Sequence, residues 1–339
     1  MISHGFKIIG TFHTADDDAE DGSFFLLNSE MWASIPESIS KRIYFHDGVE
    51  IVVSANWEPA QIIASEANRI AQKSISESKE GLFKWLEPFP SDLEVPIKVI
   101  MNGENDLLNL EWYPIFFVDN YLYDLFLILN LALPGSADFM NLRIQSDASK
   151  ETTSPTRLSP YYFHAAHAKK EDWPSLSEIK VSTIETWYSL VRKNISQIPQ
   201  SPLERALFST LHVCRSDGRP EDIIWIFHAL ESLLQTRVGE NFSALVERLT
   251  LILSPDAKQE SVMRKKLREM YNHRSSFVHG GLDIIHPMHN EVIDPRAGDA
   301  YSSTVELSEY GIKLLLACFQ HFAKNGWLNV NFRVAMEIE

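Results

Sequence analysis

Apolar residues recur at helical spacing, with few interruptions, from about residue 174 to the end of the chain. Positions three and four residues apart lie on one face of an α-helix, so each of these runs predicts a helix with one buried side. Short polar links, several with Gly or Pro, separate the runs, which is typical of helices packed beside their sequence neighbours. The pattern predicts an all-α helical bundle over residues 171–339.

Residues that commonly start helices precede most of these runs. Each has a side chain that can accept a hydrogen bond from a free backbone N–H of the first turn. The expected starts are Ser175 with Glu178, Ser201 with Pro202, Asn241, Ser254 with Pro255, and Ser303 with Glu306. Residues 281–302, which contain two prolines and many polar residues, are expected to form a long loop before the last helix.

The first 170 residues show a mixed pattern and predict an α+β domain. Segments 41–46 and 49–54 flank Asp47-Gly48, a dipeptide typical of β-hairpin turns. Other strands are expected at 6–12, 23–27, 95–101 and 142–145. Helices are expected at 59–78 and 121–133, and the polar stretch 146–156 is expected to be a loop or linker.

The charge distribution restricts the kinds of partner. A net charge of −15 argues against a broadly basic protein that wraps nucleic acid. Residues 202–283, however, contain eleven Lys and Arg and eleven Asp and Glu, so the excess of acid lies elsewhere. It is densest at 16–21, which predicts a solvated loop, with a metal-binding or nucleic-acid-mimicking loop as the alternative.

The chain has the features of a cytoplasmic protein. The apolar stretch 121–133 is too short and too polar to span a bilayer, and no signal peptide is visible at the N-terminus. Cys214 and Cys318 lie on helix-patterned segments, which favours reduced thiols in a core over a disulfide.

One motif combines residue types suited to chemistry on phosphates. Residues 274–281 read RSSFVHGG and end a predicted helix, so Arg274 is five positions before His279. An imidazole can move a proton near neutral pH, and a guanidinium can hold two phosphate oxygens. Gly280 and Gly281 let the chain leave the helix and let other groups approach closely. Without further context, an ordinary helix-end pair, with Arg274 on Asp283 or Glu231, explains the same spacing.

The stretches 229–234 (ALESLL) and 271–281 (YNHRSSFVHGG) give the wider region 175–325 a family resemblance. It resembles the HEPN superfamily, and more closely its Apea-like branch. The resemblance implies RNA cleavage without metal or cofactor by a homodimer, with Arg274 and His279 of both copies facing one cleft. It also implies a setting in phage defence or a toxin-like stress response. The N-terminal domain would then be the sensor or regulator that meets a trigger or regulatory partner.

Several neighbouring residues are candidates for supporting roles. Ser275 stands where the family often has Asn, Asp or His, and its hydroxyl can still orient a water or a phosphate. Glu231 is expected either to hold Arg274 or His279 or to face solvent. The basic residues Arg264, Lys265, Lys266 and Arg268 either track an RNA backbone or form a solvated helix face.

Helical geometry leaves a question about the motif. Five steps of about 100° place Arg274 and His279 roughly 140° apart around an ideal helix. Either the helix loosens before Gly280, or the two residues cooperate across a dimer cleft.

Other functions fit parts of the sequence. A non-catalytic dimerisation or ligand-sensing module agrees with the net charge and with Ser275. Nucleotide binding in the bundle lacks a Gly-rich phosphate loop. The pairs His164/His167 and His286/His289 have a spacing that can seed a metal site, but neither has the acidic or thiol partners of zinc motifs.

Overall fold

The computed structural model describes residues 1–339 except 12–22, 34, 36, 78–91, 154–155, 216–218, 237–241, 287, 289 and 333–339. The acidic run 16–21, Asn241 and His289 therefore lie outside the described residues. The backbone contacts divide the chain into two units. The sheet unit comprises Met1–Pro160, Ile179–Thr186 and Lys193–Ile195, and the helical unit comprises Tyr161–Glu178, Trp187–Arg192 and Ser196–Glu339.

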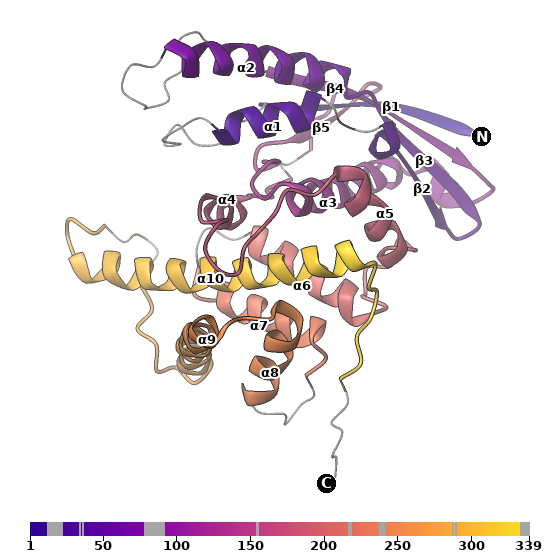
Figure 1. Ribbon diagram of the computed structural model, residues 1–339. Helices are drawn as coiled ribbons and strands as arrows, with labels where there is room; N and C mark the ends of the chain where they lie inside the picture. The colour runs from indigo at the N-terminus through magenta and orange to yellow at the C-terminus, as the bar shows by residue number, and fades with distance from the viewer. Residues whose placement is uncertain are drawn as a thin grey trace. The chain divides into compact units, whose positions relative to one another are not determined.

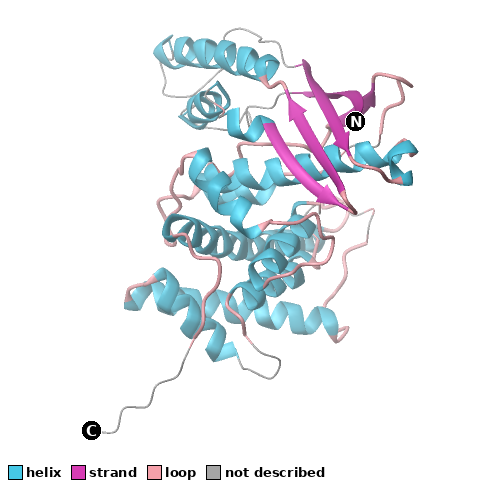
Figure 2. Ribbon diagram, turned by 90° about the vertical axis from the view of Figure 1, so that its right-hand side faces the viewer, coloured by secondary structure: helices cyan, strands magenta, loops and turns pink. Residues whose placement is uncertain are grey.

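The sheet unit contains a five-stranded antiparallel sheet with the strand order β2-β3-β4-β1-β5 (Figure 2, magenta). Its strands are β1 (Ile2–Thr11), β2 (Lys41–His46), β3 (Val49–Ala55), β4 (Asp92–Asn102) and β5 (Arg143–Ser146). The predicted hairpin is confirmed as β2–β3. Its turn residues have positive φ, 49° at Asp47 and 77° at Gly48, as a two-residue turn between twisted strands requires.

One face of this sheet is buried and the other meets solvent. Along β4, Val95, Ile97 and Val99 are buried, while Pro96 and Lys98 between them are exposed. Among the described helices, α2 (Glu58–Glu77) and α3 (Trp112–Ala132) make the main contacts with the sheet. This alternation is the normal pattern of an antiparallel sheet with helices on one face.

Helix α3 is a core helix of the sheet unit. By length and composition it is long and apolar enough to cross a membrane, but 72% of its apolar window is buried. It contacts β3, β4 and β5, and the 3-10 helix η2 (Asp106–Asn109). The expected buried helix at 121–133 is thus confirmed as part of α3.

The expected strand at 23–27 is wrong, because this segment begins helix α1 (Ser23–Ala33), which packs on α2. Four consecutive apolar residues, 24–27, do not distinguish a buried strand from a buried helix, and the packing partner decides.

The polar stretch 146–156 stays within the sheet unit, where Thr153 N–H donates to the Ile144 carbonyl at 2.9 Å. A further 3-10 helix, η1 (Glu37–Ser40), precedes β2.

The helical unit is built around its last helix (Figure 1, yellow and orange). Helix α10 (Pro295–Asn325) contacts α4, α7, α8 and α9, and its segment from Gly311 to Gln320 is buried. The other helices are α4 (Tyr161–Ala168), α6 (Pro202–Cys214), α7 (Asp222–Leu233), α8 (Phe242–Leu253) and α9 (Ala257–Val278). Helix α5 (Val181–Val191) contributes residues to both units. The predicted order, an α+β region followed by a helical region, is confirmed.

The predicted helix starts have mixed outcomes. Ser201 is confirmed as the cap of α6, where its hydroxyl accepts from Glu204 N–H at 3.0 Å. Ser303 is wrong as the start of the last helix, because α10 begins earlier: its cap is Asp294, nine residues before Ser303. Asp294 followed by Pro295 is itself a typical helix start. The next two turns are mostly polar, however, so they lack the apolar spacing from which a helix is predicted. The loop expected at 281–302 is correspondingly shorter.

Ser175 and Glu178 do not cap a helix, because α5 begins only at Val181. The reason is a side chain far away in the sequence. The buried Gln320 amide of α10 donates to the Ser177 carbonyl at 2.8 Å and accepts from Ser177 N–H at 3.1 Å. Both backbone groups of Ser177 are thereby satisfied without helix formation.

Gly311 allows α10 to approach its neighbours closely. A Cβ at this position would lie 2.5 Å from Met270 Cε of α9 and 2.7 Å from Ile226 Cγ2 of α7. We expect Gly311→Val to destabilise the protein by about 1–3 kcal/mol, measured by thermal unfolding, because a branched side chain overfills this contact. Gly298→Ala is the control, since its nearest neighbour is the movable end of Glu291. Equal melting temperatures for the two variants would contradict the close packing.

Candidate functional site

Helix α9 carries most of the predicted site residues. Asp256 and Gln259 form a reciprocal capping box at its start, with 2.8 Å for each hydrogen bond, two residues beyond the expected Ser254. Met263, Leu267 and Met270 are fully buried and form one stripe along the helix. Arg274 continues that stripe by one more turn. The stripe directs the Arg274 side chain toward the other helices of the unit.

Arg274 contacts two residues of α7, Glu231 and Phe227. Its Nη1 lies 2.9 Å from Glu231 Oε1, and its guanidinium carbon lies 5.4 Å from the centre of the Phe227 ring. The side chains of Arg274 and Glu231 are 32% and 36% exposed. The structure thus gives Glu231 as the partner of Arg274. The pair is accessible from solvent, and one hydrogen bond leaves further guanidinium N–H groups to bind a ligand.

His279 lies at the C-terminal cap of α9 and is exposed. Gly280 has a φ of 71°, and Gly281 N–H donates to the Ser276 carbonyl at 2.7 Å. Gly280 N–H donates to the Phe277 carbonyl at 3.3 Å, which completes a Schellman motif. The prediction that the two glycines let the chain leave the helix is confirmed.

The structure does not join the two residues of the motif directly. No hydrogen bond links Arg274 to His279, both of which are described. The helix keeps its regular form up to Val278, so it does not loosen before the cap. Ser275 is exposed, and its carbonyl accepts from His279 N–H at 3.0 Å. Within one chain, Arg274 turns toward α7 and His279 marks the end of α9.

The four basic residues earlier in α9 all have partners nearby. Arg264 pairs with Glu260 at 2.9 Å, and Lys265 and Lys266 approach Glu269 at 3.9 and 3.7 Å. The Arg268 guanidinium lies 4.0 Å from the centre of the Phe242 ring. The three ion pairs are largely solvent-exposed and therefore weak.

No family model matches the chain, and no curated protein or solved structure is similar to it. The arguments about function therefore rest on the residues and on their geometry.

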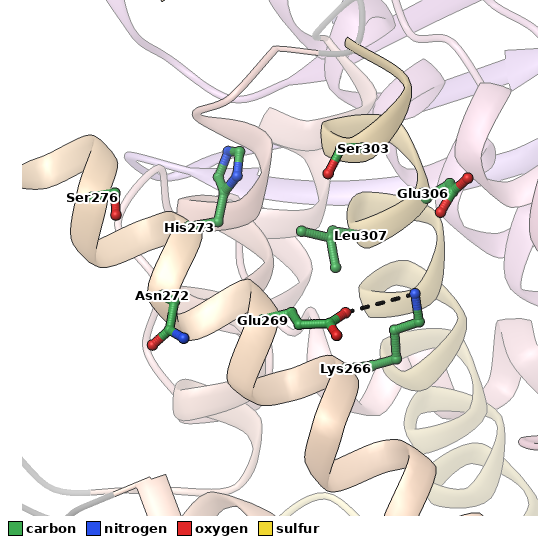
Figure 3. Close-up of a pocket in the computed structure, with 8 residues that line it drawn as sticks. All are labelled: Lys266, Glu269, Asn272, His273, Ser276, Ser303, Glu306 and Leu307. Atoms are coloured by element: carbon green, nitrogen blue, oxygen red, sulfur yellow. Dashed lines mark ion pairs between the residues drawn. The ribbon is translucent and has the colours of Figure 1, made fainter. Parts of the chain in front are cut away.

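A cavity of about 420 Å³ lies between α9 and α10. Figure 3 shows that His273 and Glu269 of α9 face Ser303 and Leu307 of α10 across it. Burial lowers the pKa of His273, and its Nε2 has no hydrogen-bond partner among the described residues. Of the predicted site residues, the cavity is lined only by Lys266. It is thus separate from Arg274 and His279.

The described members of the two histidine pairs do not form a metal centre in this chain. His167 is buried in α4, and burial lowers its pKa to about 4. His286 lies in the loop after α9, where its Nδ1 accepts from Met288 N–H at 3.0 Å. Among the described residues, no three His, Cys, Asp or Glu side chains group as metal ligands.

Sequence reasoning missed one histidine beside Arg274. His228 of α7 is exposed, and its Nδ1 lies 2.6 Å from Ser209 Oγ of α6. Its pKa is lowered by burial first, then by the charge of Arg205, with a further contribution from Arg274; Glu231 opposes these effects. The signal in the sequence was its position three residues before Glu231, which places both on one side of α7.

Proposed function

We propose that the protein is a metal-independent endoribonuclease in which Arg274 and His279 belong to the active centre. The observation that carries this proposal is that Arg274, although it continues a buried stripe, keeps its guanidinium accessible with one hydrogen bond to Glu231. The resemblance of residues 229–234 and 271–281 to Apea-like HEPN domains gives the reaction class.

The residue types agree with cleavage through the RNA 2′-hydroxyl. The 2′-oxygen attacks the neighbouring phosphorus, the bond to the 5′-oxygen breaks, and a cyclic phosphate and a free 5′-hydroxyl result. Arg274 would bind the scissile phosphate and stabilise the charge that grows on its oxygens. His279, exposed at the end of α9, would act as general acid or base.

We further propose that the active form is a homodimer. In one chain, Arg274 faces α7 while His279 lies at the cap, and an ideal helix separates them by roughly 140°. A second copy facing the first would supply both residue types to one cleft. A cytoplasmic role in phage defence or a toxin-like stress response, with the sheet unit as sensor or regulator, completes the proposal.

The acidic net charge is compatible with RNA as substrate. Residues 202–283 are neutral overall, and Arg264, Lys265, Lys266 and Arg268 add positive charge along α9. Arg264, Lys265 and Lys266 pair with carboxylates, and their side chains are between 36% and 78% exposed. We propose that RNA phosphates exchange with these carboxylates, which makes binding sensitive to salt.

The test compares wild type with Arg274→Ala on total RNA in the presence of a chelator. We expect the variant to cleave about 100-fold more slowly, because the phosphate loses its charge-assisted hydrogen bonds, and Arg274→Lys to fall between the two. Arg296→Ala is the matched control, since Arg296 is 89% exposed and pairs only locally with Asp294. Equal rates for wild type and Arg274→Ala, or cleavage that stops with the chelator, would contradict the proposal.

A non-catalytic dimerisation or ligand-sensing module is the second candidate. It is favoured by the Arg274–Glu231 pair, which also serves as an ordinary contact between α7 and α9, and by the cavity between α9 and α10. For such a module we expect a dimer that leaves total RNA intact under the same conditions.

A further inference from the structure

A second imidazole lies close to the proposed phosphate-binding arginine. His228 follows Phe227, on which the Arg274 guanidinium packs, and precedes Glu231, its ion-pair partner, by three residues. The charges of Arg274 and Glu231 both act on the His228 ring. Arg274, Glu231 and His228 thus form one accessible group on α7 and α9.

The hydrogen bonds of Ser209 assign the proton of a neutral His228 ring to Nδ1. The Ser209 side chain is buried, and its Oγ lies 2.9 Å from the Arg205 carbonyl and 2.6 Å from His228 Nδ1. A carbonyl can only accept, so the single hydroxyl proton is used in the bond to Arg205. The hydroxyl oxygen must then accept from His228 Nδ1–H. In the neutral ring, Nε2 is therefore left with a free electron pair.

The surroundings also keep this ring neutral near pH 7. Burial and the positive charges of Arg205 and Arg274 lower the pKa of His228, and the carboxylate of Glu231 only partly compensates. His212 is the remaining titratable neighbour, and its pKa is lowered too, by burial first. The Trp225 ring contacts both imidazoles. It stacks on His212 with 4.1 Å between the ring centres, and it meets His228 edge-on with 6.3 Å between the ring centres.

We infer that His228 is the general base of the reaction, accepting the proton of the RNA 2′-hydroxyl at Nε2 while Arg274 holds the scissile phosphate. This inference rests on the proposed ribonuclease function. As the bond from the 2′-oxygen to phosphorus forms, its proton passes to Nε2. The bond from phosphorus to the 5′-oxygen breaks, and that oxygen takes a proton from the imidazolium of His279. Exchange of one proton at each ring with water restores the starting state.

Ser209 is a positioning residue in this mechanism, because it reaches RNA only through His228. We expect Ser209→Ala to lower kcat about tenfold with KM unchanged, since the ring is no longer held in the required tautomer. A purely structural role would lower the melting temperature without changing kcat of the folded protein.

The main test measures kcat/KM for RNA cleavage against pH in wild type, His228→Ala and His228→Gln. For wild type we expect activity to rise with pH as His228 loses its proton, with an apparent pKa below the usual value of a histidine. Both variants are expected to lose this rise and to cleave about 100-fold more slowly at neutral pH. His228→Gln keeps a donor for Ser209, so agreement of the two variants excludes a folding defect. His286→Ala serves as the control.

The outcomes separate this inference from the function on which it rests. If His228→Ala cleaves like wild type while Arg274→Ala is slow, His228 is not the base and the ribonuclease function stands. If wild type does not cleave RNA, both are overturned. A titration of the His228 ring by NMR gives a readout without turnover. We expect inorganic phosphate to raise the pKa of His228 in wild type but not in Arg274→Ala, and no change in wild type would contradict the placement of phosphate beside this ring.

Discussion

The His279→Ala variant is expected to cleave RNA about 10³- to 10⁴-fold more slowly than wild type. The imidazole at the end of α9 transfers a proton in the proposed reaction, and loss of a positioned general acid or base typically has an effect of this size. His279 is exposed at the helix cap, and its backbone makes the capping hydrogen bonds. The variant therefore keeps the Schellman motif, and its stability is expected to stay within about 0.5 kcal/mol of wild type.

The measurement is single-turnover cleavage of total RNA with chelator present, with the ends of the products identified. His286→Ala provides the matched control, because His286 is also an exposed histidine but lies seven residues further along the loop. We expect this control to produce the same cyclic phosphate ends as wild type at the same rate. Products of equal amount and kind from His279→Ala and wild type would remove His279 from the mechanism.

The Glu204→Ala variant is expected to have the largest effect on stability, a loss of about 3–5 kcal/mol. Glu204 and Arg192 form a buried ion pair at 2.7 Å, with side chains only 4% and 6% exposed. The carboxylate also accepts from Gln200 N–H at 2.5 Å, and the guanidinium donates to the Ser196 carbonyl at 3.0 Å. Removal of one partner of such a pair leaves a buried charge uncompensated.

Calorimetric unfolding of the full chain measures this loss. Glu260→Ala is the control: it removes another glutamate–arginine pair at 2.9 Å, but one whose side chains are 35% and 49% exposed. Exposed pairs contribute between about 0 and 1 kcal/mol, so the control is expected to melt close to wild type. Similar melting temperatures for Glu204→Ala and Glu260→Ala would show that the buried Arg192–Glu204 pair contributes no more to stability than an exposed pair.

Local signals in the sequence predicted much of the fold. The Asp47-Gly48 turn, the strand at 95–101 and the cap at Ser201 each depend on neighbouring residues, and each is found in the structure. The strand expected at 23–27 failed because packing between α1 and α2 decides that segment. The helix start expected at Ser175 failed because Gln320 of α10, 143 positions further along the chain, satisfies both backbone groups of Ser177 outside a helix.

In the candidate site, too, residues identified by local sequence were predicted and those identified by contacts between helices were not. The Arg274/His279 motif, the glycines that end α9 and the candidate partner Glu231 could be predicted from residue types and their spacing. For His228 only the spacing of three from Glu231 is visible in the sequence, because the contacts that distinguish it come from Ser209 on another helix and from the charge of Arg274. Contacts of this kind depend on how three helices pack, which no single run of sequence specifies.

The central position of α10 has a consequence for how the protein is made. Helices α7 and α9, which carry the proposed site, are synthesised before α10, and they pack on it through Ile226, Met270 and Gly311. During translation the sheet unit can fold early, as domains nearer the N-terminus generally do. The helical unit must wait for its central helix to emerge from the ribosome. A ribonuclease assembled in this order would remain inactive while its growing chain is still held on the ribosome, next to ribosomal RNA.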